Sequence, residues 1–451
     1  MATFLHHQDI WTTFAEGEAG PAKDWASARL AIYAPNQPFS FPTDPSLHDP
    51  LVAAGPPSLF PALINALQAP TLELAATSAA LGLYGMLPAD PVPLTTALRQ
   101  AMTGDDHEQN AWLALAIMHL DALQAQDLAA AAKATGPDIL WQLPSLVLHQ
   151  ANSTANLDEA AIAVANSLPR NQSWDESPLA SILNLLGVPT LPSGPDDPTE
   201  ALELGATMAQ GVAPPLKARG SRKRRSQKLV MALCERRDSP AAVLLRAVYD
   251  KEPQATLGTA PICAAAWLHC FKPKNPLDDI LTRTAGNNLE CLSEARRHAK
   301  EEDTAKIAAA FAEHRLPASI GVVALPVLTQ DLAHLVIQTA NFGQSANIRA
   351  EALAINAAAR FPDLVPPMLA DQNTRGLGLV LAEWVPTEEV LLALMTLPIP
   401  PDSEDRVQYA RALAAIGDRA AEPALEAVLR QEKPSRMAWA QRLNRSLLGP
   451  G

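Results

Sequence analysis

Cysteine and aromatic residues are scarce in this sequence, and long apolar runs are missing. Only 4 of the 451 residues are cysteines and none are spaced as CxxC, so neither a disulfide framework nor a cysteine-rich zinc site is expected. Aromatic residues make up 5% of the chain, which argues against a fold rich in strands. No apolar run approaches the roughly 18 to 20 residues that a membrane span needs, and no basic segment followed by an apolar stretch opens the sequence. We therefore expect a cytoplasmic protein without a membrane span.

Familiar catalytic and metal-binding motifs are also missing. The sequence contains no GxSxG, GxxxxGK[ST], GxGxxG or HExxH pattern, and its 10 histidines are scattered. Cys263, His269 and Cys270 lie near one another, but on a helix they would share an apolar stripe with Trp267, which is typical of packing. The sequence thus predicts a protein that is not an enzyme and that holds no cofactor or metal.

Alanine and leucine are the most frequent residues of the chain, and its apolar residues recur with helical spacing. In residues 421–429 the apolar side chains fall at i, i+3, i+4, i+7 and i+8, which places them on one face of a helix. Gly417 and Asp418 separate this helix from the one before it, and Pro423 is tolerated in the first turn, where N–H groups lack intrahelical partners. A helical hairpin cannot cover its own apolar face, so neighbouring pairs must stack on it. The pattern predicts an all-α fold with Leu413, Leu425 and Val428 buried between the repeats.

The 40 prolines stand mainly between the periodic segments, where they begin or end helices. The prolines within residues 36–50 predict that this segment has no regular structure. Residues 292–314 are instead predicted to form one long charged helical stretch. Residues 188–198 lack periodicity and form the candidate boundary. We predict an N-terminal helical cap (residues 1–55), acidic helical repeats (56–187), a hinge with a basic loop (188–228) and C-terminal repeats (229–451).

The segment 406–430 resembles the HEAT-like repeat family. The residues that carry this resemblance are Ala412, Leu413, Ile416, Gly417, Asp418, Pro423 and Leu425. The resemblance implies an α-α superhelix, a solenoid of antiparallel helix pairs, and a role as scaffold, adaptor or subunit in a bacterial multiprotein assembly. It is also consistent with an alternative, a nucleic-acid-binding solenoid similar to the alkylpurine DNA glycosylases.

Charge is distributed unevenly along the chain. Residues 1–200 contain 5 Lys+Arg against 21 Asp+Glu, a balance of −16, whereas the remainder contains 30 against 27, a balance of +3. An acidic surface repels nucleic acid and attracts neutral or basic protein surfaces. A protein partner is therefore favoured over nucleic acid, and the oligomeric state is left open.

The candidate binding residues form a basic run between residues 217 and 228. Such charge density suits an acidic protein, a phosphate backbone, a nuclear-import receptor or a lipid surface, and equally a solvated loop between helices. No aromatic residue lies within the run, which weakens the case for base stacking. A single tryptophan in a polar stretch is the other candidate, as an exposed contact for a partner. The candidates are Lys217, Arg219, Arg222, Lys223, Arg224, Arg225, Lys228 and Trp174.

Overall fold

The computed structural model is helical, and no strand occurs in the part of the chain that it describes. Among the described residues, those within Met1–Ala69, Tyr84–Pro88 and Leu328–Gly451 form one compact unit, and those within Pro70–Leu83 and Ala89–Val327 form a second. The all-α prediction is confirmed. The described residues are 16, 20–33, 39–102, 105–131, 273–284, 289–313, 317–340, 350–385, 387–416 and 422–431.

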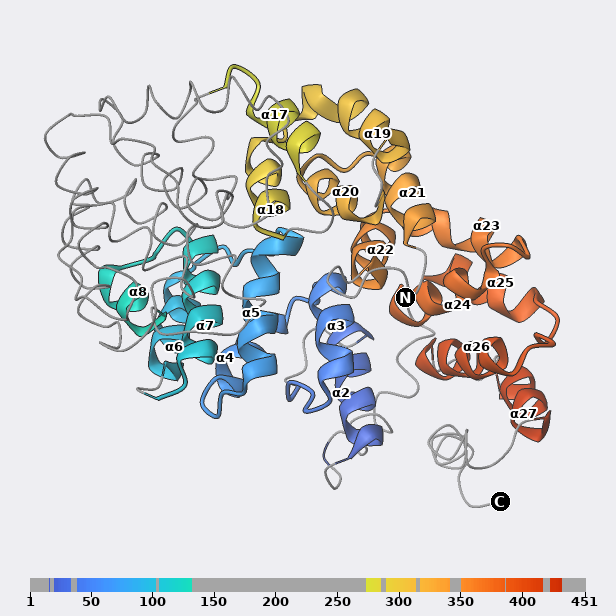
Figure 1. The fold of residues 1–451 in the computed structure, drawn as a ribbon. Helices are drawn as coiled ribbons and strands as arrows, with labels where there is room; N and C mark the ends of the chain where they lie inside the picture. The colour runs from blue at the N-terminus through green and yellow to red at the C-terminus, as the bar shows by residue number, and fades with distance from the viewer. Residues whose placement is uncertain are drawn as a thin grey trace, which may run out of the picture. The chain divides into compact units, whose positions relative to one another are not determined.

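The first unit combines helices from both ends of the sequence (Figure 1). Helix α3 packs on α22 and α24, so the N-terminal segment lies against the C-terminal helices. The elements are α2 (Pro21–Tyr33), the 3₁₀ turn η2 (Pro45–Leu47), α3 (His48–Ala54), α4 (Leu59–Ala66), α21 (Gln330–Thr339), α22 (Ala350–Arg360), η5 (Pro362–Leu364), α23 (Val365–Ala370), α24 (Arg375–Trp384), α25 (Glu388–Thr396), α26 (Ser403–Ile416) and α27 (Glu422–Gln431).

Helices α22 to α27 pack in an interleaved order. Helix α24 packs against both α22 and α26, while α23 packs against α25, so helices two positions apart in the sequence are neighbours. Consecutive helices also touch, as α23 does with α24 and α26 with α27. Figure 1 shows α24 and α26 side by side, with α25 next to them. Leu413 and Val428 are buried as predicted, whereas the predicted burial of Leu425 lies outside the side chains that the structure describes.

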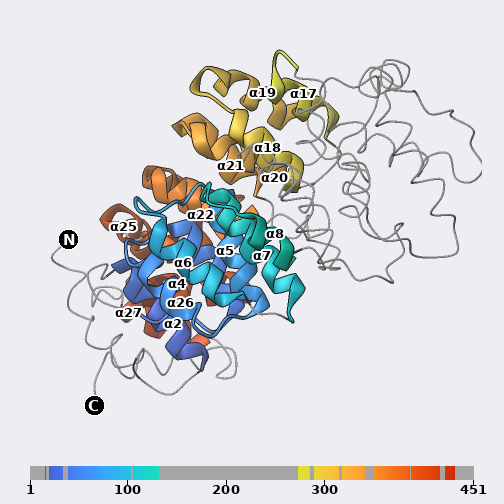
Figure 2. The same cartoon turned by 90° about the vertical axis from the view of Figure 1, so that its left-hand side faces the viewer.

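The second unit contains two groups of helices. Helices α6, α7 and α8 lie side by side, and α18 packs against α17 and α20 (Figures 1 and 2). Gly82 in α5 allows the side chain of His119 in α7 to come close, because a Cβ atom at this position would lie 2.0 Å from the imidazole. The elements are α5 (Leu72–Tyr84, its last residue in the first unit), α6 (Val92–Ala101), α7 (His107–His119), α8 (Ala125–Ala131), α17 (Pro276–Arg283), α18 (Leu289–His298), η3 (Glu301–Asp303), α19 (Thr304–Glu313), α20 (Pro317–Ala324) and η4 (Leu325–Val327).

The expectation of irregular structure in residues 36–50 is wrong at its C-terminal end. Helix α3 begins at His48 and includes Pro50, which is tolerated because N–H groups of the first turn have no intrahelical acceptor. Gly55 ends the helix in the left-handed conformation, with φ of 60°, and its N–H donates to Leu51 and Val52 carbonyls. A short helix therefore fits between closely spaced prolines.

The charged stretch 292–314 is divided into two helices. Helix α18 ends at His298, and Lys300 takes an extended conformation with φ of −125° before η3 and α19. The Asp303 carboxylate accepts a hydrogen bond from the Lys300 N–H at 3.2 Å, which caps the new helical segment. All residues between Ala299 and Ala305 are polar, so the apolar stripe is interrupted where the cap ends one helix and begins the next.

Candidate functional site

A buried carboxylate, Glu383 near the end of α24, collects hydrogen bonds from two other helices of the first unit. Its Oε1 atom accepts from the Trp25 indole of α2 at 2.9 Å and from the Arg411 guanidinium of α26 at 3.1 Å. Arg29 of α2 donates to the same oxygen, and the Gln408 amide of α26 donates to Oε2 at 2.7 Å. This charged group is thus shielded from water and surrounded by donors, as a buried charge requires.

The Arg29 guanidinium also lies against two indole rings. Its central carbon is 4.0 Å from the ring centroid of Trp384 and 5.1 Å from that of Trp25. Arginine is well suited to this position because its planar, weakly hydrated cation stacks on aromatic faces while still donating to a carboxylate. We call this group the Glu383 cluster; it consists of Trp25, Arg29, Glu383, Trp384, Gln408 and Arg411.

The electrostatics of the cluster keep Glu383 ionised. Burial by itself would raise the pKa of this carboxyl, but the positive charges of Arg29 and Arg411, with hydrogen bonds from Trp25 and Gln408, lower the pKa to about 2. A carboxyl with so low a pKa is a poor proton donor or acceptor near neutral pH. The arrangement suits recognition of a cation better than proton transfer.

Glu351, in the first turn of α22, responds in the opposite way. Burial raises the pKa of this half-buried carboxyl, and the negative charges of Glu383 and Asp49 raise it further, while Arg411 opposes them. Five charged groups therefore interact in and around the cluster. They are the carboxylates of Glu351, Glu383 and Asp49 and the guanidiniums of Arg29 and Arg411. Negative charge exceeds positive charge by one.

Replacing Glu351 by Gln should make the protein relatively more stable as pH rises. A carboxyl whose pKa is raised in the folded state favours folding while protonated, and this contribution is lost as pH rises from the unfolded value, 4.5, through the folded one. Glutamine does not titrate, so the difference in unfolding free energy, Glu351→Gln minus wild type, should increase between pH 4 and pH 8. Urea titrations at several pH values measure it; a difference independent of pH would contradict the assignment.

Other polar contacts hold the N-terminal segment in the first unit. The Asp24 carboxylate of α2 accepts from the Thr43 and Asp44 backbone N–H groups at 2.9 and 3.0 Å, which fixes the chain leading to η2. The Asn356 amide of α22 donates to the Ala53 carbonyl near the end of α3 at 3.1 Å. This bond satisfies one of the carbonyls that a helix end leaves without an intrahelical donor.

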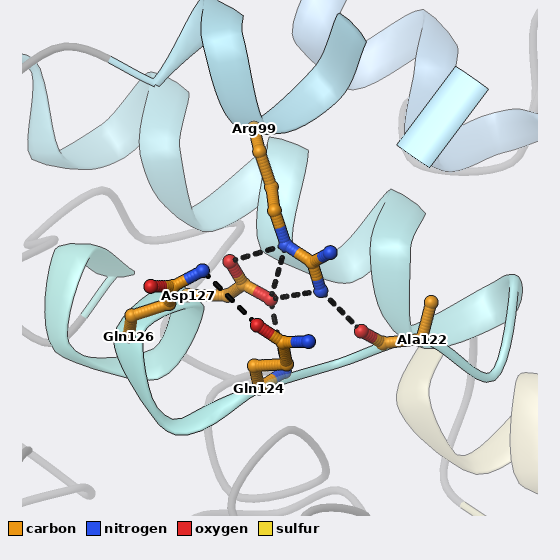
Figure 3. Close-up of polar contacts among 5 residues, drawn as sticks. All are labelled: Arg99, Ala122, Gln124, Gln126 and Asp127. Carbon is orange, nitrogen blue, oxygen red and sulfur yellow. Dashed lines mark hydrogen bonds and ion pairs between the residues drawn. The ribbon is translucent and has the colours of Figure 1, made fainter. Parts of the chain in front are cut away.

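The second unit has its own ion pair, between Arg99 of α6 and Asp127 of α8 (Figure 3). Arg99 Nε donates to Asp127 Oδ1 at 3.1 Å and Nη2 donates to Oδ2 at 3.0 Å, a bidentate arrangement, and Nη2 also reaches the Ala122 carbonyl. Asp127 accepts in addition from the Gln124 N–H at 2.9 Å, which caps the start of α8. The Asp127 carboxylate therefore connects α8 to α6 and also caps the N-terminus of α8.

Replacing Asp127 by Ala should lower the unfolding free energy by about 1 to 3 kcal/mol, because the half-buried Arg99 guanidinium loses its carboxylate partner and the Gln124 N–H at the start of α8 loses its cap. Chemical denaturation followed by circular dichroism measures the change. The matched control is Gln126→Ala, whose exposed amide donates only to Gln124 in Figure 3 and should cost at most about 0.5 kcal/mol. Equal effects of the two substitutions would show that the ion pair contributes nothing.

The candidate residues from the sequence all lie outside the described residues. These are Lys217, Arg219, Arg222, Lys223, Arg224, Arg225, Lys228 and Trp174. Sequence reasoning missed the Glu383 cluster, although one signal was present: Glu383 stands inside the apolar stretch 379–385. A charge at such a position requires a buried partner.

No protein-family model, curated protein or solved structure matches the chain. Within the described ranges, no helix is both long enough and apolar enough to cross a membrane. In the same part of the chain, His, Cys, Asp and Glu side chains do not gather in groups of three that could hold a metal ion.

Proposed function

We propose that this protein is a HEAT-like helical-repeat scaffold that binds a protein partner and has no catalytic activity of its own. In this proposal it acts as an adaptor or subunit of a multiprotein assembly in the cytoplasm. The acidic balance of residues 1–200 favours a neutral or basic protein surface as partner over nucleic acid.

The observation that supports the proposal most is the interleaved packing of α22 to α27. Neighbours two positions apart, such as α22 with α24 and α24 with α26, are what stacked helix pairs produce when each pair covers the apolar face of the next. Stacked pairs expose long, repetitive surfaces, and proteins built from them bind partners on these surfaces. The exposed pair Leu392 and Met395, one turn apart on α25, provides apolar surface of this kind.

Affinity capture tests the proposal. The tagged full-length chain should retain a specific protein, identified by mass spectrometry and then shown to bind the purified chain directly at physiological salt. A variant with Arg222, Lys223, Arg224 and Arg225 changed to Glu, and another with Leu392→Ser and Met395→Ser, then report which surface is used. Leu72→Ser serves as the matched control, because Leu72 is an exposed leucine of the other unit. Recovery of the bait alone under gentle conditions would contradict the scaffold proposal.

The nucleic-acid alternative is tested on the same purified chain. A duplex DNA probe should show no binding in fluorescence anisotropy at 150 mM salt if the protein is a protein-binding scaffold. Binding that weakens steeply with salt and disappears in the variant with Arg222, Lys223, Arg224 and Arg225 changed to Glu would favour the alternative.

A further inference from the structure

The contact between the N-terminal segment, residues 20–69, and the C-terminal helices of the first unit has the composition of an interface between proteins. Trp25 and Arg29 are fully or almost fully buried in it, and both contact the end of α24. Tryptophan and arginine in desolvated pockets are the residue types that dominate binding energy at protein interfaces. Contacts within one folding core are instead mostly apolar.

Trp25 and Arg29 project from one side of α2, because residues four apart lie on the same helix face. Helix α3 packs on α22 and α24, whereas α2 contacts α24 through these two long side chains. The part of the contact that α2 makes with α24 therefore depends on a pair of side chains on a single helical turn. A helix from another protein can reproduce such a pair.

The receiving side of the contact is held together independently of α2. Gln408 and Arg411, both on α26, hydrogen-bond to Glu383, so the carboxylate keeps two donors when Arg29 and Trp25 leave. Of the five charged groups named above, Glu383, Glu351 and Arg411 lie outside the N-terminal segment, and together they carry an excess of one negative charge. A site that is already ordered and negatively charged favours a helix that carries a cation.

We propose that α24 and α26 form a recognition site for a protein helix that presents Trp and Arg four residues apart, and that the chain's own α2 occupies this site in cis. The guanidinium of the partner would stack on Trp384 and donate to Glu383, as Arg29 does. The proposal rests on the proposed function, since it names the partner chemistry of one surface of the scaffold. It also makes the N-terminal segment a competitor of the partner.

Competition in cis sets the expected affinities. A tethered segment has an effective concentration in the millimolar range, so an external helix binds the intact chain much more weakly than a chain whose α2 has lost its anchors. The probe is the recombinant fragment of residues 1–69, labelled with fluorescein. The receptor is the full-length chain carrying Trp25→Ala and Arg29→Ala, with retained helicity checked by circular dichroism.

The labelled fragment should bind this receptor at least about tenfold more tightly than it binds the wild-type chain. The same fragment with Arg29→Ala should bind at least about tenfold more weakly, and Glu383→Gln in the receptor should have a similar effect. Equal affinity for the substituted and wild-type chains, or no dependence on Arg29, would overturn the proposal. Failure here leaves the capture experiment unaffected, because that experiment does not depend on this site.

A second experiment covers the case in which the receptor with both substitutions does not fold. A protease site is inserted between Ala69, which is exposed, and Pro70 of the otherwise wild-type chain, and the chain is cut after folding. The cut chain should stay assembled and exchange its N-terminal fragment for the labelled one, and Glu383→Gln should accelerate this exchange. A cut chain that aggregates, or that never exchanges, would show that the segment is an inseparable part of the core and would overturn the proposal.

Discussion

Replacing Glu383 by Ala should lower the unfolding free energy of the first unit by about 3 to 5 kcal/mol. The substitution removes the carboxylate that pairs with Arg29 and leaves that guanidinium buried, with its charge no longer balanced by Glu383. The hydrogen bonds from the Trp25 indole and the Gln408 amide to Glu383 are lost as well. Urea denaturation of the full-length chain, followed by far-ultraviolet circular dichroism, measures the loss as an earlier transition.

The matched control is Glu389→Ala. Glu389 is an exposed glutamate in the first turn of α25, in the same unit, and it should contribute at most about 1 kcal/mol through the helix dipole. Glu383→Gln should lie between the two, because glutamine preserves the shape and one acceptor but not the charge. If Glu383→Ala and Glu389→Ala cost the same, the cluster does not hold the N-terminal segment in place.

Most helices could be predicted from the sequence where an apolar stripe and a clear cap occur together. Residues 107–119 are an example: Asp106 caps α7 by accepting from the Gln109 N–H at 3.0 Å, and most of the apolar side chains that follow are buried. The short helix within residues 36–50 is harder to predict, because proline is disfavoured in the interior of a helix but tolerated in the first turn, where Pro50 lies. A rule based on residue type alone cannot distinguish the two positions.

The Glu383 cluster could not be predicted for a different reason. Arg29 and Glu383 are 354 residues apart, and helical periodicity gives no information about which distant charges meet. The sequence indicates only that Glu383, within an apolar stretch, needs a partner. It contains 35 Lys and Arg residues, so the choice of partner depends on the tertiary packing of α3 on α22 and α24.

The association of the N-terminal segment with helices more than 300 residues away has a consequence for specificity. Apolar surfaces tolerate many partners, whereas a buried carboxylate is stable only opposite a well-placed cation. The charge of Arg29 therefore selects this docking arrangement over others in which an apolar face of α2 or α3 would be covered equally well. Exchange of the segment should be correspondingly sensitive to Glu383.

Acid should weaken the first unit through Glu383 in a defined pH range. The pKa of this carboxyl is about 2 in the folded protein against 4.5 in its unperturbed state, so its ionised form stabilises folding above pH 4.5 and this contribution is lost as pH falls toward 2. The full contribution is about 3 kcal/mol, of which about 2 kcal/mol should disappear between pH 5 and pH 3.

Other carboxylates also titrate in this pH range, so the informative quantity is the difference in unfolding free energy between wild type and Glu383→Gln in urea titrations at each pH. That difference should shrink by about 2 kcal/mol from pH 5 to pH 3. A constant difference would mean that Glu383 titrates normally and is not held by Arg29 and Arg411.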